Sequence, residues 1–274
     1  WEAQVGGELK LNVGPFGLTL TGRLAKGAAA PAGLDVLELL GQDRVVLIID
    51  EITHLCHKLG PEAAGEFLSA LRARRQSGGP PLVISGSIGI HHALADLSPV
   101  NDLWPVAVGP LATPDAVELA ARLLLGIGVP PTGRLVADIV RQTSGIPFYI
   151  QAVVDQLQYR DDLDVTGVVD ECITRNLWQT DHYVTRLAVY YGADEAKRAR
   201  AVLDFVAQSD GLVDVDSIEA RLTIDQADWK VTRDDLLGLL DKLEKDHYLV
   251  RQGNSDRLSS ALLARVWRHH RRLA

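Results

Sequence analysis

The chain has 274 residues, of which 47% are hydrophobic and 23% are charged. This length predicts two or three domains, and the composition excludes a disordered, collagenous or low-complexity protein. The formal net charge of −8, from 28 basic and 36 acidic side chains, excludes a whole-molecule attraction to nucleic acid or anionic lipid. Any such contact has to be local.

Cysteine usage and apolar run lengths predict a cytoplasmic protein. Cys56 and Cys172 are the only cysteines and lie far apart, which argues against a disulfide framework and favours a reducing compartment. No run reaches the roughly 18 consecutive apolar residues that span a bilayer, and the segment after Trp1 is not a signal peptide, so no membrane contact is expected. Methionine is absent, so we expect further residues upstream of Trp1.

The first part of the chain is predicted to form a parallel α/β core. Residues 8–40 predict a two-stranded hairpin, a loop and a short helix. Arg44–Ile49 and Pro81–Ile84 are apolar on both faces and predict buried strands, with a helix over Pro61–Gln76 between them and a third short strand over 106–108. A strand, a helix and a strand at this spacing form a βαβ unit in a sheet covered by helices.

After residue 110 the pattern changes to helix upon helix, beginning with the start signal Thr113-Pro114-Asp115. The expected helices cover residues 114–125, 133–143, 147–159, 164–178, 199–208, 216–222 and 233–246. A hairpin over 248–259 and a basic terminal helix around 265–272 follow. Three helices and a hairpin predict a winged helix. The predicted domains are a partial core (1–110), an all-α lid (111–192) and a winged-helix domain (193–274).

The sharpest chemical signal is Asp50-Glu51 at the carboxyl end of a predicted buried strand. Ligands of open α/β sheets bind outside the carboxyl ends of the strands. There, Asp50 can hold Mg²⁺ directly or through water, and Glu51 can polarise a water that attacks a γ-phosphate. Ser85 and Ser87 end the next strand, where a polar sensor would reach the phosphate; alternatively, they form an ordinary Ser/Gly turn.

Three segments together carry a resemblance to a known family: Val46–Glu51, Leu82–Ser87 and Gly145–Ile150, followed by the predicted winged helix. Their order resembles that of the archaeal-type ATPases of the STAND branch of AAA+ proteins, over nearly the whole chain. The resemblance implies an AAA+-like P-loop core, ATP and Mg²⁺ as ligands, and a lid helix lying over the nucleotide that begins at Gly145 and Pro147. A helix-breaking turn would also explain those two residues.

The family's phosphate-binding loop, Gly-x-x-x-x-Gly-Lys-Ser/Thr, does not occur in the sequence, and no arginine starts the segment after Pro147. Either the loop lies upstream of Trp1, which we expect because the chain lacks an initiator methionine, or the chain has lost it and cannot hydrolyse ATP.

Other candidate sites are weaker. His54, Cys56 and His57 crowd near Asp50, but on a helix Cys56 points away from the two histidines, which argues against zinc. A hydrolase role for Ser87 is disfavoured, because the segment around it lacks the first glycine of a nucleophile elbow.

The sequence favours a nucleotide-dependent switch in which ATP sets the arrangement of lid and winged helix. The alternative is a DNA-binding or protein-docking winged helix with a vestigial ATPase core. The segment 233–246 carries five acidic and three basic residues, so DNA is disfavoured and a protein partner is preferred. The basic cluster over 265–272 either touches a phosphate backbone or is a solvated helix end.

Overall fold

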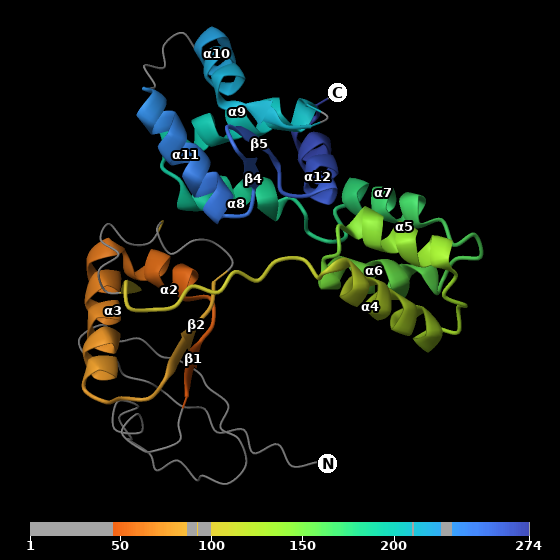
Figure 1. The fold of residues 1–274 in the computed structure, drawn as a ribbon, viewed down its shortest axis with the longest axis horizontal. Coiled ribbons are helices and arrows are strands. Elements are labelled where there is room, and N and C mark those ends of the chain that lie inside the picture. Colours follow the sequence, from red (N-terminus) through yellow and green to blue (C-terminus); the bar gives the residue numbers. More distant parts are fainter. Residues whose placement is uncertain (1–45, 87–91, 93–99, 210, 226–231, 274) are drawn as a thin grey trace. The chain divides into compact units, whose positions relative to one another are not determined.

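The computed structural model describes residues 46–86, 92, 100–209, 211–225 and 232–273 (Figure 1). The chain divides into two compact units, Trp1–Leu103 and Trp104–Ala274. The hairpin and helix predicted within residues 8–40, and Ser87, lie outside the described residues. Within the described ranges, no helix is both long and apolar enough to cross a membrane.

The described part of the first unit contains the predicted strand, helix and strand, with an additional short helix directly after the first strand. It runs β1 (Leu47–Ile49), α2 (Ile52–Leu59), α3 (Pro61–Gln76) and β2 (Leu82–Ile84). The two strands pair in parallel, with Ile49 opposite Ile84, so both strands end at the same edge of the sheet (Figure 1). This shared edge is what positions the candidate site.

The two faces of this small sheet differ. Leu47, Ile49, Leu82 and Ile84 pack against a core formed by α2 and α3. Ile48 and Val83 alternate with them and are 68% and 51% exposed, respectively. The sequence predicts strands buried on both faces, and this holds on one face only, because the helices described here cover a single side.

The third strand predicted over residues 106–108 is absent. The segment between Leu103 and Leu111 has no regular structure, and Val106 and Val108 are 76% and 86% exposed. β-branched residues favour a strand only where a neighbouring strand supplies hydrogen bonds, and no described residue pairs with this segment.

The second unit begins with a helical layer, which we call the lid. It consists of α4 (Thr113–Gly126), α5 (Gly133–Thr143), α6 (Pro147–Leu157) and α7 (Val165–Thr174). Proline stands in the first turn of α4 and of α6, and the Thr132 hydroxyl caps α5 by accepting from the Leu135 N–H. The apolar faces of these helices share one core that includes Leu124, Ile139, Ile150 and Val169.

The rest of the second unit, which we call the C-terminal domain, mixes helices with a small antiparallel sheet. Its elements are α8 (His182–Tyr190), α9 (Ala193–Gln208), β3 (Val213–Asp214), α10 (Val215–Asp225), α11 (Arg233–Lys245), β4 (Leu249–Gln252), β5 (Ser255–Leu258) and α12 (Ala261–Arg271). The sheet order is β3-β5-β4. Gly253, at φ 63°, supplies the positive φ that the two-residue turn between β4 and β5 requires.

The three predicted helices and the hairpin of this domain are present, whereas α8 is an addition that the sequence pattern missed. Helix α11 starts at a capping box formed by Thr232 and Asp235. Its buried positions are Leu236, Leu239, Leu240 and Leu243. Helical spacing of the leucines also predicts Leu237 as a core position in place of Leu239, but Leu237 is only partly buried, because adjacent leucines leave the edge of a helical stripe ambiguous.

Candidate functional site

The structure brings Asp50 and Ser85 together at the shared carboxyl edge of β1 and β2. The Ser85 N–H donates to the Ile49 carbonyl at 3.0 Å, which continues the parallel ladder by one residue. The Ser85 hydroxyl then donates to Oδ1 of Asp50. Both side chains are exposed, so they can meet a ligand from solvent.

Glu51 sits beside Asp50 in a backbone conformation that is uncommon for glutamate. Its φ of 51° and ψ of 43° are left-handed, and its N–H donates to Asp50 Oδ1 at 3.0 Å. The Glu51 carbonyl accepts from the N–H groups of His54 and Leu55, and so starts α2. The left-handed conformation costs a residue other than glycine about 1–2 kcal/mol. Such backbone strain concentrates at functional sites. The sequence gives no signal for this conformation.

The donor set at this edge suits a hard divalent cation. Asp50 offers a carboxylate and Ser85 a hydroxyl, and both are the oxygen ligands that Mg²⁺ prefers. Mg²⁺ sites commonly combine one or two carboxylates with waters and phosphate oxygens, so a dedicated cage is not required. No group of three or more His, Cys, Asp or Glu side chains is placed to hold a metal by itself within the described ranges.

The other predicted site residues lie elsewhere. Gly145 and Pro147 belong to the second unit, where Gly145 follows α5 and Pro147 starts α6. A Cβ on Gly145 would lie 3.1 Å from the Leu111 carbonyl oxygen, and its φ of +71° also requires glycine. A local packing role therefore accounts for Gly145.

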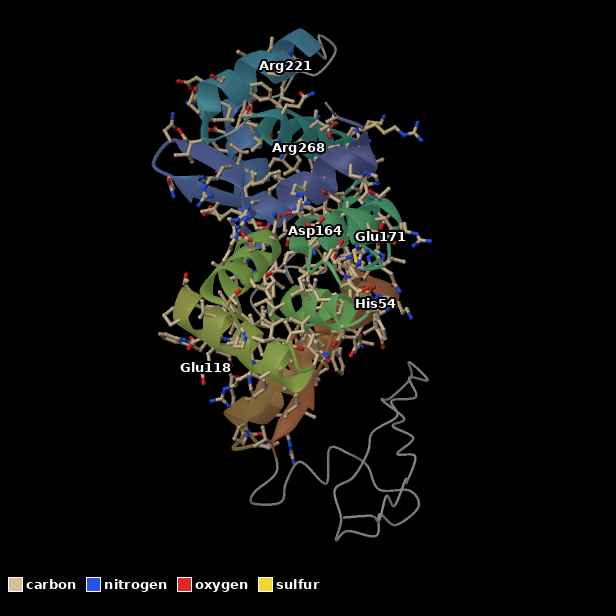
Figure 2. All side chains as sticks on the ribbon, turned by 90° about the vertical axis from the view of Figure 1, so that its right-hand side faces the viewer. His54, Glu118, Asp164, Glu171, Arg221 and Arg268 are labelled. Atoms are coloured by element: carbon tan, nitrogen blue, oxygen red, sulfur yellow. The ribbon has the colours of Figure 1, made fainter. Side chains whose placement is uncertain are left out.

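The His54 region has the geometry of an ordinary amphipathic helix. His54 lies on the exposed side of α2 (Figure 2), whereas Cys56 is fully buried in the core of the first unit. Burial raises the pKa of the Cys56 thiol, which disfavours the thiolate that a zinc ion needs.

The basic cluster at the end of the chain is engaged within the protein. Arg265 donates to Gln142 and, at 2.5 Å, to Asp170. Arg271 forms two hydrogen bonds with the carboxylate of Asp204. Arg268, labelled in Figure 2, donates to the Ala207 carbonyl at 3.3 Å. These partners hold the three guanidinium groups in place. They leave fewer N–H donors that could bind the phosphate oxygens of a nucleic acid.

Comparison with known proteins and solved structures identifies the fold of the chain. No known protein family and no curated protein matches the sequence. The structure is similar to that of the Walker-type ATPase paby2304 of Pyrococcus abyssi, with a TM-score of 0.62 and 17% sequence identity. The match covers 85% of this chain and 65% of that one, so the chain spans about two thirds of the length of its structural neighbour. The chain therefore has the fold of a Walker-type ATPase.

Proposed function

We propose that the chain is part of a nucleotide-binding ATPase of the STAND/AAA+ type, with Asp50 as metal ligand and Glu51 as the residue that positions water. The observation that carries the proposal is the hydrogen bond from Ser85 to Asp50, because it joins two strand ends at the edge where open α/β sheets bind ligands. The likeness to a Walker-type ATPase supports the same interpretation.

We propose one role for each of these residues. Asp50 would hold Mg²⁺ directly or through water while its Oδ1 accepts from Ser85, which fixes the carboxylate plane. When bound, the metal supplies charge that neutralises the phosphate oxygens. Glu51 accepts a hydrogen bond from the attacking water and orients it toward the γ-phosphorus, while Ser85 and Ser87 act as polar sensors.

The remaining assignments concern the second unit. Gly145 and Pro147 would present the start of α6 to the nucleotide, and the C-terminal domain would be a winged helix. The element order α9, β3, α10, α11, β4, β5 and the sheet order β3-β5-β4 support the winged-helix assignment. The 274 residues contain no Gly-x-x-x-x-Gly-Lys-Ser/Thr string, so the proposal assigns the cradle of the triphosphate to residues outside them.

Calorimetry with ATP and Mg²⁺ on the full-length protein tests the proposal. Asp50→Asn is expected to weaken Mg²⁺-dependent ATP binding about ten-fold, the equivalent of losing one charge-assisted interaction of about 1.5 kcal/mol. Glu66→Gln, which removes an exposed carboxylate from α3, is the matched control and should bind as the wild type does. Equal affinity for wild type and Asp50→Asn would reject the metal assignment.

The 274-residue chain alone should bind ATP weakly, because it lacks the amides and lysine of a phosphate loop. Micromolar affinity there would point to a different nucleotide site.

The alternative function, sequence-specific DNA binding by the C-terminal domain, predicts a different result. Helix α11 exposes Asp234 and Asp241, which would repel phosphates in a major groove. We expect only non-specific binding to random duplexes, with a Kd of about 10⁻⁴–10⁻⁶ M at physiological salt and a steep salt dependence. Submicromolar binding with a clear consensus after site selection would favour the DNA-binding alternative.

A further inference from the structure

Helix α12 belongs to two hydrophobic cores at once. Leu263 and Trp267 are buried in the core of the C-terminal domain, which also contains residues of α8, α9 and α11. Leu262 and Val266 are buried in the lid core, with residues of α4 to α7. Each pair is spaced four residues apart, so the two pairs form adjacent stripes along one helix. Removing α12 would therefore open both cores.

Polar contacts fasten α12 to the lid side along its whole length. At its start, the Leu262 N–H donates to the Ser144 hydroxyl at 3.2 Å. In its middle, Arg265 bonds Asp170, the 2.5 Å contact described above. Near its end, Nε2 of His270 lies 2.9 Å from the Thr180 hydroxyl, in the connection between α7 and α8. Several spaced contacts restrict rotation about the helix as well as separation from the lid.

A second junction lies away from α12 and involves three hydrogen-bonded tyrosines. The hydroxyl of Tyr149, in lid helix α6, donates to the hydroxyl of Tyr183 in α8 at 3.3 Å. Tyr248, which precedes β4, donates from its hydroxyl to the Tyr183 carbonyl at 2.6 Å. The Arg186 guanidinium lies over both the Tyr183 and Tyr248 rings, at 5.0 and 4.4 Å from their centroids. Two separate junctions define a fixed orientation better than one.

The turn that precedes α6 is bonded on both sides. Ser144 is in the left-handed conformation at φ 55°, and its hydroxyl accepts the hydrogen bond from the Leu262 N–H at the start of α12. The next carbonyl, that of Gly145, accepts from the Leu111 N–H at 3.0 Å, where the chain enters the lid. A displacement of this turn would therefore also displace the first turn of α12 or break its hydrogen bond to Ser144.

We infer that α12 ties the lid and the C-terminal domain into a single moving body, so that nucleotide binding carries the two together and does not swing one against the other. Domain interfaces within a chain move readily unless they are extensive and apolar. Here the apolar residues of one helix complete both cores. The nucleotide part of this inference rests on the proposed function, whereas the rigidity of the second unit does not.

Distance measurements by double electron–electron resonance test the inference on the full-length protein. In a Cys56→Ala, Cys172→Ala background, spin labels at Ala137→Cys on α5 and Ala220→Cys on α10 report the lid against the C-terminal domain; both alanines are exposed. We expect one narrow distance distribution without nucleotide, unchanged by ATP and Mg²⁺. A broad distribution, or one that shifts with nucleotide, overturns the inference.

A second label pair separates this inference from the proposed function. Ala70→Cys on α3, paired with Ala137→Cys, should shift on ATP binding by about 5 Å, the scale of a hinge or helix-register motion. If calorimetry finds no ATP binding, the proposed function fails, and the distribution without nucleotide still decides whether the lid and the C-terminal domain are fixed.

Two variants weaken the α12 junction by different means. Leu262→Ala combined with Val266→Ala removes the apolar residues that face the lid. Ser144→Gly removes the short side chain and with it the hydroxyl that accepts from Leu262, and glycine adopts the left-handed backbone without strain, so this variant should fold. Both should broaden the Ala137–Ala220 distribution, whereas His269→Ala, at an exposed position on the same helix, should not. If neither variant broadens it, α12 is not the fastening element.

Discussion

Replacing Glu51 by glutamine in the full-length protein is expected to lower the rate of ATP turnover by about 10²–10⁴-fold, the usual contribution of a positioned general base. Glutamine has nearly the same shape, so the start of α2 and the hydrogen bond from the residue-51 N–H to Asp50 remain. It loses the negative charge that orients and polarises water. ATP affinity should therefore stay close to that of the wild type. A coupled phosphate-release assay beside calorimetry measures both quantities.

Glu66→Gln is again the matched control, because it removes an exposed carboxylate from the same unit without touching the strand ends. Turnover by Glu51→Gln at the wild-type rate would remove Glu51 from the mechanism. A loss of ATP binding in Glu51→Gln would instead assign it to ligand binding.

The meeting of Asp50 and Ser85 was predictable from the sequence, because parallel strands end at a shared edge of the sheet. A buried strand that ends in a carboxylate, and a second parallel strand that ends in serine, must meet at one edge once the strands pair, and Asp50 and Ser85 do so. The left-handed backbone of Glu51 was not predictable. Backbone dihedral angles depend on the contacts on both sides of a residue, and here the Ile52 N–H is held by the Ser85 carbonyl at 2.9 Å.

Long-range partners explain what sequence reasoning missed. The terminal arginines form a basic run in the sequence, yet Arg265 meets Asp170 and Arg271 meets Asp204, partners that no local pattern can identify. The same limit applies to residues 106–108. Their β propensity predicts a strand, but a strand forms only where a neighbouring strand pairs with the segment. Leu262 and Leu263 are buried in different cores, and the sequence could not predict this either, because it depends on which helices pack against each side of α12.

Trp267 is the side chain whose loss should cost the second unit most stability. It is fully buried, and its ring meets Tyr248 edge-on, with the centroids 6.0 Å apart. Its indole Nε1 donates to Asp204 at 2.9 Å, on the same carboxylate that binds Arg271. The residue therefore combines a large apolar contact with the hydrogen bond that a buried indole requires.

Trp267→Ala should lower the free energy of unfolding by about 3–5 kcal/mol, because a large cavity replaces the ring. At roughly 2–4 °C per kcal/mol, the melting temperature of the second unit should fall by about 6–20 °C. Trp267→Phe keeps most of the packing and loses the bond to Asp204, so it should cost only about 1 kcal/mol. Urea and thermal unfolding of the full-length protein, followed by circular dichroism, measure the difference. Equal losses in both variants would mean that the hydrogen bond to Asp204, and not the packing of the ring, is the main contribution of Trp267.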